Sequence, residues 1–341
     1  MGRKKIILSY DYELFFGDKS GTVLKSIIQP TYKLLDAIES VGLKGSFFVD
    51  WQMLKNLKEA NTERTLSDLR MIVDQIHDII RRGHRIELHM HPHWVNAKYN
   101  GDGTWDFSDF SHYMLSTFSV EDITSMFVEG CNLLNSIARE VEPAYSIVAF
   151  RAGGWAVQPF SMLKDAFKAS GIKIDSSTSF GAFNLKEDQK YDFRKMPKKA
   201  VYRFSEDVTI EDEKGEFIEV PISSYKQNFL LKMIRKMKEK KGVLERTTDG
   251  VHTRSNDPLK IKNNPSLMER LFNSYPTMFS HSQFPAINVF MASLLNRDEV
   301  ICVIDHPKDF SKETVRGIKA MGNVGTACTY MDIYKELAEK I

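Results

Sequence analysis

The sequence predicts an α/β protein built on a parallel sheet or a (β/α) barrel. Short apolar strands alternate with amphipathic helical stretches along the chain, and polar residues stand where the strands stop. The chain has 341 residues, of which 42% are hydrophobic and 27% charged. This composition is typical of a globular protein, and the length allows one barrel-sized domain.

Each expected element follows from its residue pattern. Buried strands are expected at the apolar runs Ile6–Tyr10, Lys44–Val49, Arg85–His89, Tyr145–Phe150, Ile172–Ile174 and Val300–Ile304. Helices are expected where apolar residues recur at helical spacing, at Ile27–Val41, Leu66–Arg82, Val120–Glu140 and Pro159–Ser170. Gly42, Gly83 and Gly171 stand where three of these helices end.

The alternation breaks between about Tyr191 and Arg297. Residues 200–221 indicate a β-hairpin, residues 229–241 a basic amphipathic helix, and residues 250–265 a polar stretch. We expect this segment to be an insertion over the barrel mouth within a single domain, 1–341. Residues 94–119 form a second long loop, and loops of that length are usually functional or disordered.

Charge and cysteine content restrict the classes of partner and the cellular compartment that we expect for the protein. The net charge of +2 gives no reason to expect a nucleic-acid partner. Cys131, Cys302 and Cys328 are few and odd in number, which suits free thiols in a reducing compartment. The sequence has no apolar run long enough for a signal peptide or a transmembrane segment. We therefore expect a cytoplasmic protein.

The stretch GHRIELHMHPHW, residues 83–94, carries three histidines at alternating positions. Several imidazoles directly after a buried strand predict a divalent metal site, because a catalytic metal needs about three protein ligands and one open position. We favour His89 with His93, because Pro92 argues against a regular continuation of the strand. His91 stays open as the alternative, since residues two apart share a face if the strand stays extended.

Other polar side chains also stand at expected strand ends, where α/β folds build their active sites. These are Asp11, Arg151, Asp175 and His306. Glu13 follows Asp11 at the spacing that points both carboxylates to one side of an extended strand, with Tyr12 on the other.

The order of these strand-end motifs resembles the NodB-homology polysaccharide deacetylases, also called carbohydrate esterase family 4. SYDYE stands where that family has TFDDG, and KGSFFV, GHRIELHMHPH, FRAGGW, IDSS and ICVIDH follow in the family's order. The variants DYELFFG and HMHPHW are similar to a divergent bacterial subgroup associated with surface polysaccharides. The resemblance implies a distorted (β/α)7-type barrel with inserted loops and the hairpin at its mouth.

The resemblance also implies residue roles. Asp11 is the base, oriented by Arg151, and His306 is the general acid with Asp175 as its carboxylate partner. Trp155 is a candidate for stacking on the sugar. The family's second Asp, a metal ligand, is Tyr12 here, so either Glu13, which we favour for its reach, or Asp11 would be the third ligand beside the histidines.

The expected function is metal-dependent hydrolytic N-deacetylation of an acetamido sugar or saccharide in surface-polysaccharide biosynthesis, with zinc as the metal. Loss of the usual metal-binding Asp keeps open a non-catalytic carbohydrate-binding protein on the same fold. An amidase acting on other amides, or a glycosidase of the same architecture, is the remaining alternative.

Overall fold

A computed structural model describes residues 3–227, 229–253 and 276–339. Its centre is a nine-stranded sheet in the order β10-β11-β7-β6-β3-β2-β1-β14, with β15 also paired to β1. The strands of this sheet are β1 Lys4–Tyr12, β2 Gly45–Asp50, β3 Arg85–Met90, β6 Ala149–Ala152, β7 Ile174–Asp175, β10 Tyr202–Phe204, β11 Phe217–Glu219, β14 Val300–Asp305 and β15 Gly325–Ala327. All neighbours pair in parallel except β10 and β11.

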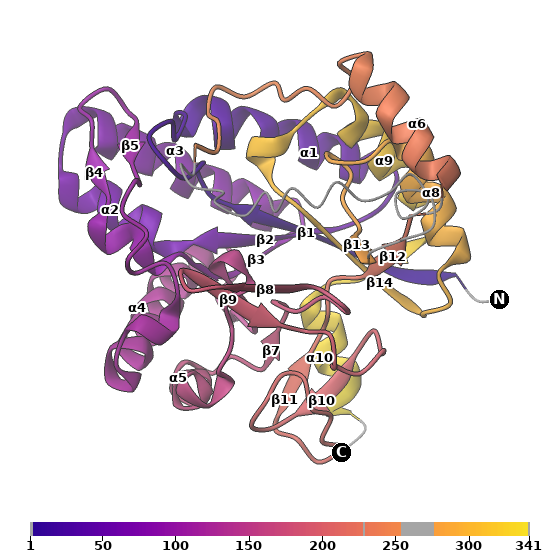
Figure 1. Ribbon diagram of the computed structural model, residues 1–341. Coiled ribbons are helices and arrows are strands. Elements are labelled where there is room, and N and C mark those ends of the chain that lie inside the picture. Colours follow the sequence, from indigo (N-terminus) through magenta and orange to yellow (C-terminus); the bar gives the residue numbers. More distant parts are fainter. Residues whose placement is uncertain (1–2, 228, 254–275, 340–341) are drawn as a thin grey trace.

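Helices pack on both sides of the curled sheet (Figure 1). They are α1 Gln29–Glu39, α2 Trp51–Ala60, α3 Glu63–Arg81, α4 Val120–Arg139, α5 Lys164–Ser170, α6 Phe229–Lys240, α8 Ala286–Leu295, α9 Lys312–Gly322 and α10 Tyr330–Ala338. Three small antiparallel pairs complete the strands: β4 Lys98–Tyr99 with β5 Trp105–Asp106, β8 Phe183–Lys186 with β9 Gln189–Asp192, and β12 Ser224–Lys226 with β13 Pro276–Met278. The distorted parallel barrel that the sequence predicts is confirmed.

The open side of the barrel, between β11 and β14, is bridged by irregular backbone. The Ile222 N–H donates to the Thr178 carbonyl at 2.8 Å, and the Ser223 N–H donates to the Cys302 carbonyl at 2.9 Å. The Cys302 N–H returns a bond to Ser223 Oγ at 3.0 Å. Hydrogen bonding therefore continues around the barrel without a regular strand at this seam.

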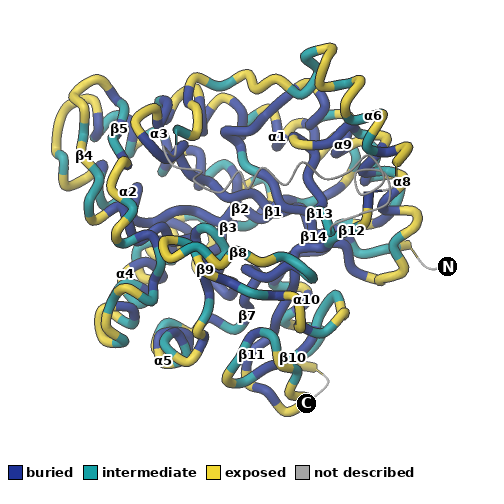
Figure 2. Tube along the Cα trace, in the orientation of Figure 1, coloured by how far each residue is buried: buried dark blue, intermediate teal, exposed yellow. Residues whose placement is uncertain are grey.

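The core lies on both faces of the sheet: a larger cluster packs the strands against the helices, and a smaller one around Phe48 and Tyr330 lies on the other face. Every residue of β2 and β14 is buried (Figure 2). Strands buried on both faces read as continuous apolar runs, which is why the sequence marks them clearly. The three cysteines are free and buried, as expected. Among the described residues no helix is both long enough and apolar enough to cross a membrane.

Several elements differ from the expectations. β6 begins at Ala149, four residues later than expected, because the Val148 and Ala149 N–H groups donate to the buried Glu87 carboxylate at 2.9 and 3.0 Å. The sequence reading missed α2, which starts directly after β2 with no turn between them.

The segment expected to be an insertion is only partly one. β10 and β11 form the predicted hairpin, yet β11 pairs in parallel with β7 and so extends the main sheet. The predicted basic helix is α6. Of the polar stretch expected at 250–265, residues 254–265 lie outside the described part of the chain.

Candidate active site and metal centre

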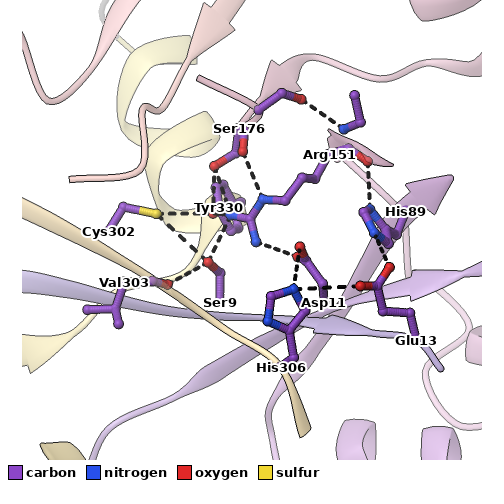
Figure 3. Close-up of polar contacts among 12 residues, drawn as sticks. Ser9, Asp11, Glu13, His89, Arg151, Ser176, Cys302, Val303, His306 and Tyr330 are labelled. Carbon is purple, nitrogen blue, oxygen red and sulfur yellow. Dashed lines mark hydrogen bonds and ion pairs between the residues drawn. The ribbon is translucent and has the colours of Figure 1, made fainter. Parts of the chain in front are cut away.

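The carboxyl ends of β1, β3, β6 and β14 meet at one edge of the sheet and carry the candidate site. Parallel pairing puts His89 beside Arg151 and Tyr10 beside Asp305, so the residues that follow β1 and β14 are neighbours too. The structure thereby brings together Asp11, Glu13, His89, Arg151 and His306, as the sequence predicts (Figure 3).

Glu13 is the centre of the site. Its Oε2 lies 2.9 Å from His89 Nε2 and 2.7 Å from His91 Nε2, and its Oε1 lies 2.7 Å from Lys308 Nζ. The same ammonium donates to the Leu14 carbonyl at 2.7 Å. Burial opposes ionisation of Glu13, but Lys308 and the two imidazoles outweigh it and hold the pKa of this carboxyl well below its usual range.

The ligand atoms of Glu13, His89 and His91 all lie within 4.8 Å of one another, and all three residues are buried. One carboxylate with two imidazoles is a donor set of catalytic zinc sites. His89 Nδ1 lies 2.8 Å from the Arg151 carbonyl, the second hydrogen bond that a metal-binding histidine usually makes and one that leaves Nε2 for a ligand. The three side chains can therefore hold a divalent metal.

Gly153 makes room for the second imidazole. A Cβ at this position would lie 2.5 Å from His91 Nδ1, which is closer than any van der Waals contact allows. The first glycine of FRAGGW is thus required by the close approach of the backbone directly after β6 to the His91 ring.

The preference for His93 over His91 as ligand is corrected by the structure. His91 has extended dihedral angles, φ −115° and ψ 90°, so it shares the face of His89. The chain turns only at the 3-10 helix Pro92–Asn96, which carries the His93 ring among the aromatic rings of Phe16, Phe107, Phe110 and Tyr113. The extended backbone thus ends after His91, one residue later than we expected from the position of Pro92.

Asp11 is separate from the metal candidates. Arg151 Nη1 donates to its Oδ1 at 2.6 Å, so this carboxylate is paired with a guanidinium. The group of side chains that could hold a metal contains Glu13 and not Asp11, which favours Glu13 as the third ligand. Burial opposes ionisation of Asp11, but Arg151, His89 and His306 together lower its pKa. Tyr12 points the other way, as expected, and its hydroxyl donates to Gln75 on α3 at 2.9 Å.

Arg151 is fully buried, and each nitrogen of its guanidinium has a partner. Besides Asp11, Nη2 donates to Ser9 Oγ at 2.8 Å, to Tyr330 Oη at 3.1 Å and to Ser176 Oγ at 3.2 Å. Nε donates to the Ser176 carbonyl at 2.8 Å. The orientation of Asp11 is fixed by this network.

His306 is the member of the site that reaches solvent, with 18% of its side chain exposed. Its Nε2 lies 3.6 Å from Asp11 Oδ2 and 3.6 Å from Glu13 Oε1. Its Nδ1 lies 3.1 Å from Asp309 Oδ2, and Asp309 in turn pairs with Arg246 at 2.6 Å. Burial lowers the pKa of His306, but Asp309 and Asp11 outweigh it and raise that pKa above the usual value.

Asp175 is not the partner of His306, which corrects that prediction. It lies on β7, and its carboxylate accepts hydrogen bonds from the Ser177 N–H and hydroxyl at 2.9 and 2.7 Å. On β11 its neighbour in register is Glu219, so two buried carboxyl groups lie side by side. Burial, and then the charge of Asp175, raise the pKa of Glu219 well above its usual value.

Trp155 follows β6 at the same edge of the sheet and is partly exposed, with its ring 5.9 Å from that of Tyr191. It has a positive φ of 60°, which is uncommon for a residue other than glycine. Its contact with sugar remains a prediction.

Three residues of the site were missed. Lys308 and Asp309 lie in a 3-10 turn, Pro307–Asp309, that bends back over β1, and no sequence rule marks such a turn. Asp50 ends β2 beside His89 and accepts from Trp94 Nε1 at 2.7 Å, and burial raises its pKa to about 7. Its position at a strand end was a signal that could have identified it.

Comparison with known proteins finds likeness in structure only. Neither a family model nor a curated protein matches the sequence. Similar solved structures include a protein from Mycobacterium smegmatis described as a polysaccharide deacetylase, at 14% identity and a TM-score of 0.47 over 100% of this chain and 93% of that one. A family 4 carbohydrate esterase from Streptomyces lividans has 9% identity and a TM-score of 0.39 over 96% and 91%.

The 4-alpha-glucanotransferase from Thermococcus litoralis has 13% identity and a TM-score of 0.50, over 98% of this chain but 41% of that one. At these identities the likeness concerns the fold. The chemistry of this chain rests on its own residues.

Lys308 and Glu13 form a buried pair whose coupling is measurable. We expect Lys308→Met to lower the free energy of unfolding by about 3–5 kcal/mol, because it removes the cation from Glu13 Oε1. Urea unfolding of the metal-free protein measures this, and Lys312→Met, at an exposed position, is the control. The double variant Glu13→Gln/Lys308→Met should lose less than the sum of its single variants, whereas additive losses would mean that the pair is not coupled.

The raised pKa of Glu219 predicts how stability depends on pH. A carboxyl whose pKa is raised by folding stabilises the protein fully below its unfolded value, near 4.5, and this contribution is lost as pH rises through the folded pKa. Glu219→Gln removes the titrating group, so the free energy of unfolding of this variant should fall less than that of the wild type as pH rises. Urea unfolding across pH measures the difference, with exposed Glu213→Gln as control, and parallel curves for wild type and Glu219→Gln would contradict the assignment.

Proposed function

We propose that the protein is a metal-dependent hydrolase that removes the acetyl group from an acetamido sugar or saccharide. The observation that carries the proposal is the proximity of the Glu13, His89 and His91 ligand atoms to an ionised Asp11 and to His306, at the carboxyl ends of parallel strands. Support also comes from the resemblance of the strand-end motifs to the NodB-homology deacetylases. Surface-polysaccharide biosynthesis is the process we propose for it.

Glu13, His89 and His91 would hold the metal, for which we propose zinc. When bound, zinc supplies a Lewis acid that polarises the acyl carbonyl and lowers the pKa of a water molecule. Asp11, kept ionised by Arg151, accepts the proton of the attacking water as its oxygen bonds to the carbonyl carbon. His306, whose pKa is raised by Asp309 and Asp11, gives a proton to the nitrogen as the C–N bond breaks, so that acetate and a free amine leave.

Other residues orient these groups. Arg151 directs Asp11 through its side chain and His89 through its carbonyl oxygen. We propose that substrate approaches from the side of His306, which is partly exposed while Asp11 and Glu13 are buried. Trp155 is proposed to stack on the sugar.

Zinc titration tests the ligand set. We expect His89→Ala, His91→Ala and Glu13→Gln to weaken zinc affinity more than the roughly 10–100-fold typical for loss of a residue that only orients a ligand. His93→Ala is the matched control, a histidine of the same stretch that should keep its zinc. Asp11→Asn should keep it as well. Equal losses in His91→Ala and His93→Ala would reject His91 as a ligand.

Acetate release from acetamido saccharides tests the reaction. Asp11→Asn keeps the shape of the side chain but removes the base, so we expect kcat to fall by at least about 100-fold with zinc still bound. Asp165→Asn, at an exposed position of α5, is the control. Normal turnover in Asp11→Asn would reject its role, and a zinc-bound wild type that releases no acetate would favour a non-catalytic carbohydrate-binding protein.

A further inference from the structure

The helices α6 and α8 expose an apolar surface that an isolated globular protein would bury. The exposed residues on α6 are Phe229, Leu230, Met233 and Met237, and those on α8 are Ile287, Met291, Leu294 and Leu295. We call this set the α6–α8 face. Contiguous exposed apolar surface of this kind indicates an interaction site.

The pattern on α6 is the reverse of an ordinary surface helix. A surface helix turns its apolar stripe to the core, yet Leu231 is the buried apolar residue of α6. Leu230, Met233 and Met237 follow at i, i+3 and i+7, so they form one stripe that faces away from the protein. The exposed side of α6 therefore carries an apolar stripe where an ordinary surface helix would have only polar residues.

The two helices are neighbours in space (Figure 1). Asn288 Nδ2 on α8 donates to the Leu231 carbonyl on α6 at 2.9 Å, and both residues are buried. The exposed residues of α8 also recur at helical spacing, at i, i+4, i+7 and i+8. The exposed apolar stripes of the two neighbouring helices thus belong to one surface.

Positive charge surrounds the apolar residues. The sequence of α6, FLLKMIRKMKEK, has five basic residues and one acid. Lys236 and Lys240 are exposed and lie along the apolar stripe by helical spacing. A cavity of about 520 Å³ at the edge of the face is lined by Leu231 and Leu295 and rimmed by Lys198, Lys226 and Arg297, with Asp298 as the acid.

The opposite side of α6 is directed toward the candidate active site. Arg235 and Glu239 of α6 line a cavity of about 820 Å³ together with Arg246 and Asp309, the carboxylate that contacts His306. This cavity and the α6–α8 face therefore lie on opposite sides of α6.

We propose that the α6–α8 face docks on an anionic lipid bilayer. Helices with an apolar stripe and a lysine-rich flank lie in the membrane interface, where apolar residues enter the acyl boundary and lysines meet anionic head groups. The area is apolar enough for a second copy of the chain as well, but the excess of lysine favours an anionic partner, and two copies would bring these lysines together. Docking does not depend on the proposed hydrolysis.

Sedimentation with vesicles tests the proposal. The full chain should sediment with vesicles that contain phosphatidylglycerol and not with vesicles of phosphatidylcholine alone, and binding should weaken as salt is raised. Leu230→Asp/Leu294→Asp and Lys236→Glu/Lys240→Glu should each lower the partition coefficient by at least about tenfold. Ile210→Asp is the matched control, because Ile210 and Leu230 are both 62% exposed and Ile210 lies outside the face.

Three results would overturn the proposal: no sedimentation of the wild type with anionic vesicles, unchanged binding in both double variants, or an equal loss in Ile210→Asp. A dimeric wild type that becomes monomeric in Leu230→Asp/Leu294→Asp would instead make this face an interface between copies. Circular dichroism of each variant verifies that it is folded. Vesicle binding is measured without substrate, so it can fail while acetate release succeeds, and the reverse.

Discussion

A guanidinium without access to water is the constraint on which the site depends. Burying Arg151 is costly unless its charge is paired and its N–H groups are satisfied, so Asp11, Ser9, Ser176 and Tyr330 must all keep their positions. These partners come from β1, from the residues after β7 and from α10, three parts of the chain far apart in sequence. The same residue's carbonyl oxygen orients His89. One buried residue thus couples the geometry of the base to that of the metal candidate.

Charge balance explains why a lysine belongs in the site. Asp11, Glu13 and Asp309 are buried carboxylates within one small region, and buried carboxylates ionise only beside positive charge. Arg151 supplies that charge to Asp11, and Lys308 supplies it to Glu13. Lys308 is also above the rings of Phe15 and Phe16, 5.3 and 4.7 Å from their centroids, which adds cation–π attraction. The cluster is therefore compatible with burial before any metal is considered.

Much of this arrangement could be predicted from the sequence, because strands buried on both faces are visible as apolar runs and their ends mark the active edge. The i, i+2 relation of Asp11 and Glu13 and the opposite orientation of Tyr12 follow from strand geometry alone. The choice between His91 and His93 depended on the backbone conformation of His91, which Pro92 restricts to the extended region, so the sequence did contain a signal in favour of His91. Lys308 and Asp309 could not be predicted, because their positions depend on the shape of the turn after His306. The proximity of Asp175 and Glu219 could not be predicted either, because it depends on β11 joining the main sheet.

The seam at Ser223 has a further consequence for how this barrel can vary. The chain leaves the barrel at Ser223 and returns at β14, where Cys302 bonds to Ser223 itself, so departure and return lie next to each other. An excursion whose two ends meet on the frame can be lengthened or shortened between them, provided that Phe279 keeps its hydrogen bonds to Ser223 and Ile304. The α6–α8 face belongs to this excursion, whereas Asp11, Glu13, His89, His91 and Arg151 belong to the frame. Substitutions in α6 and α8 can therefore change the α6–α8 face while these five residues keep their contacts. Arg246, which also belongs to the excursion, is the link to the site, because it pairs with Asp309.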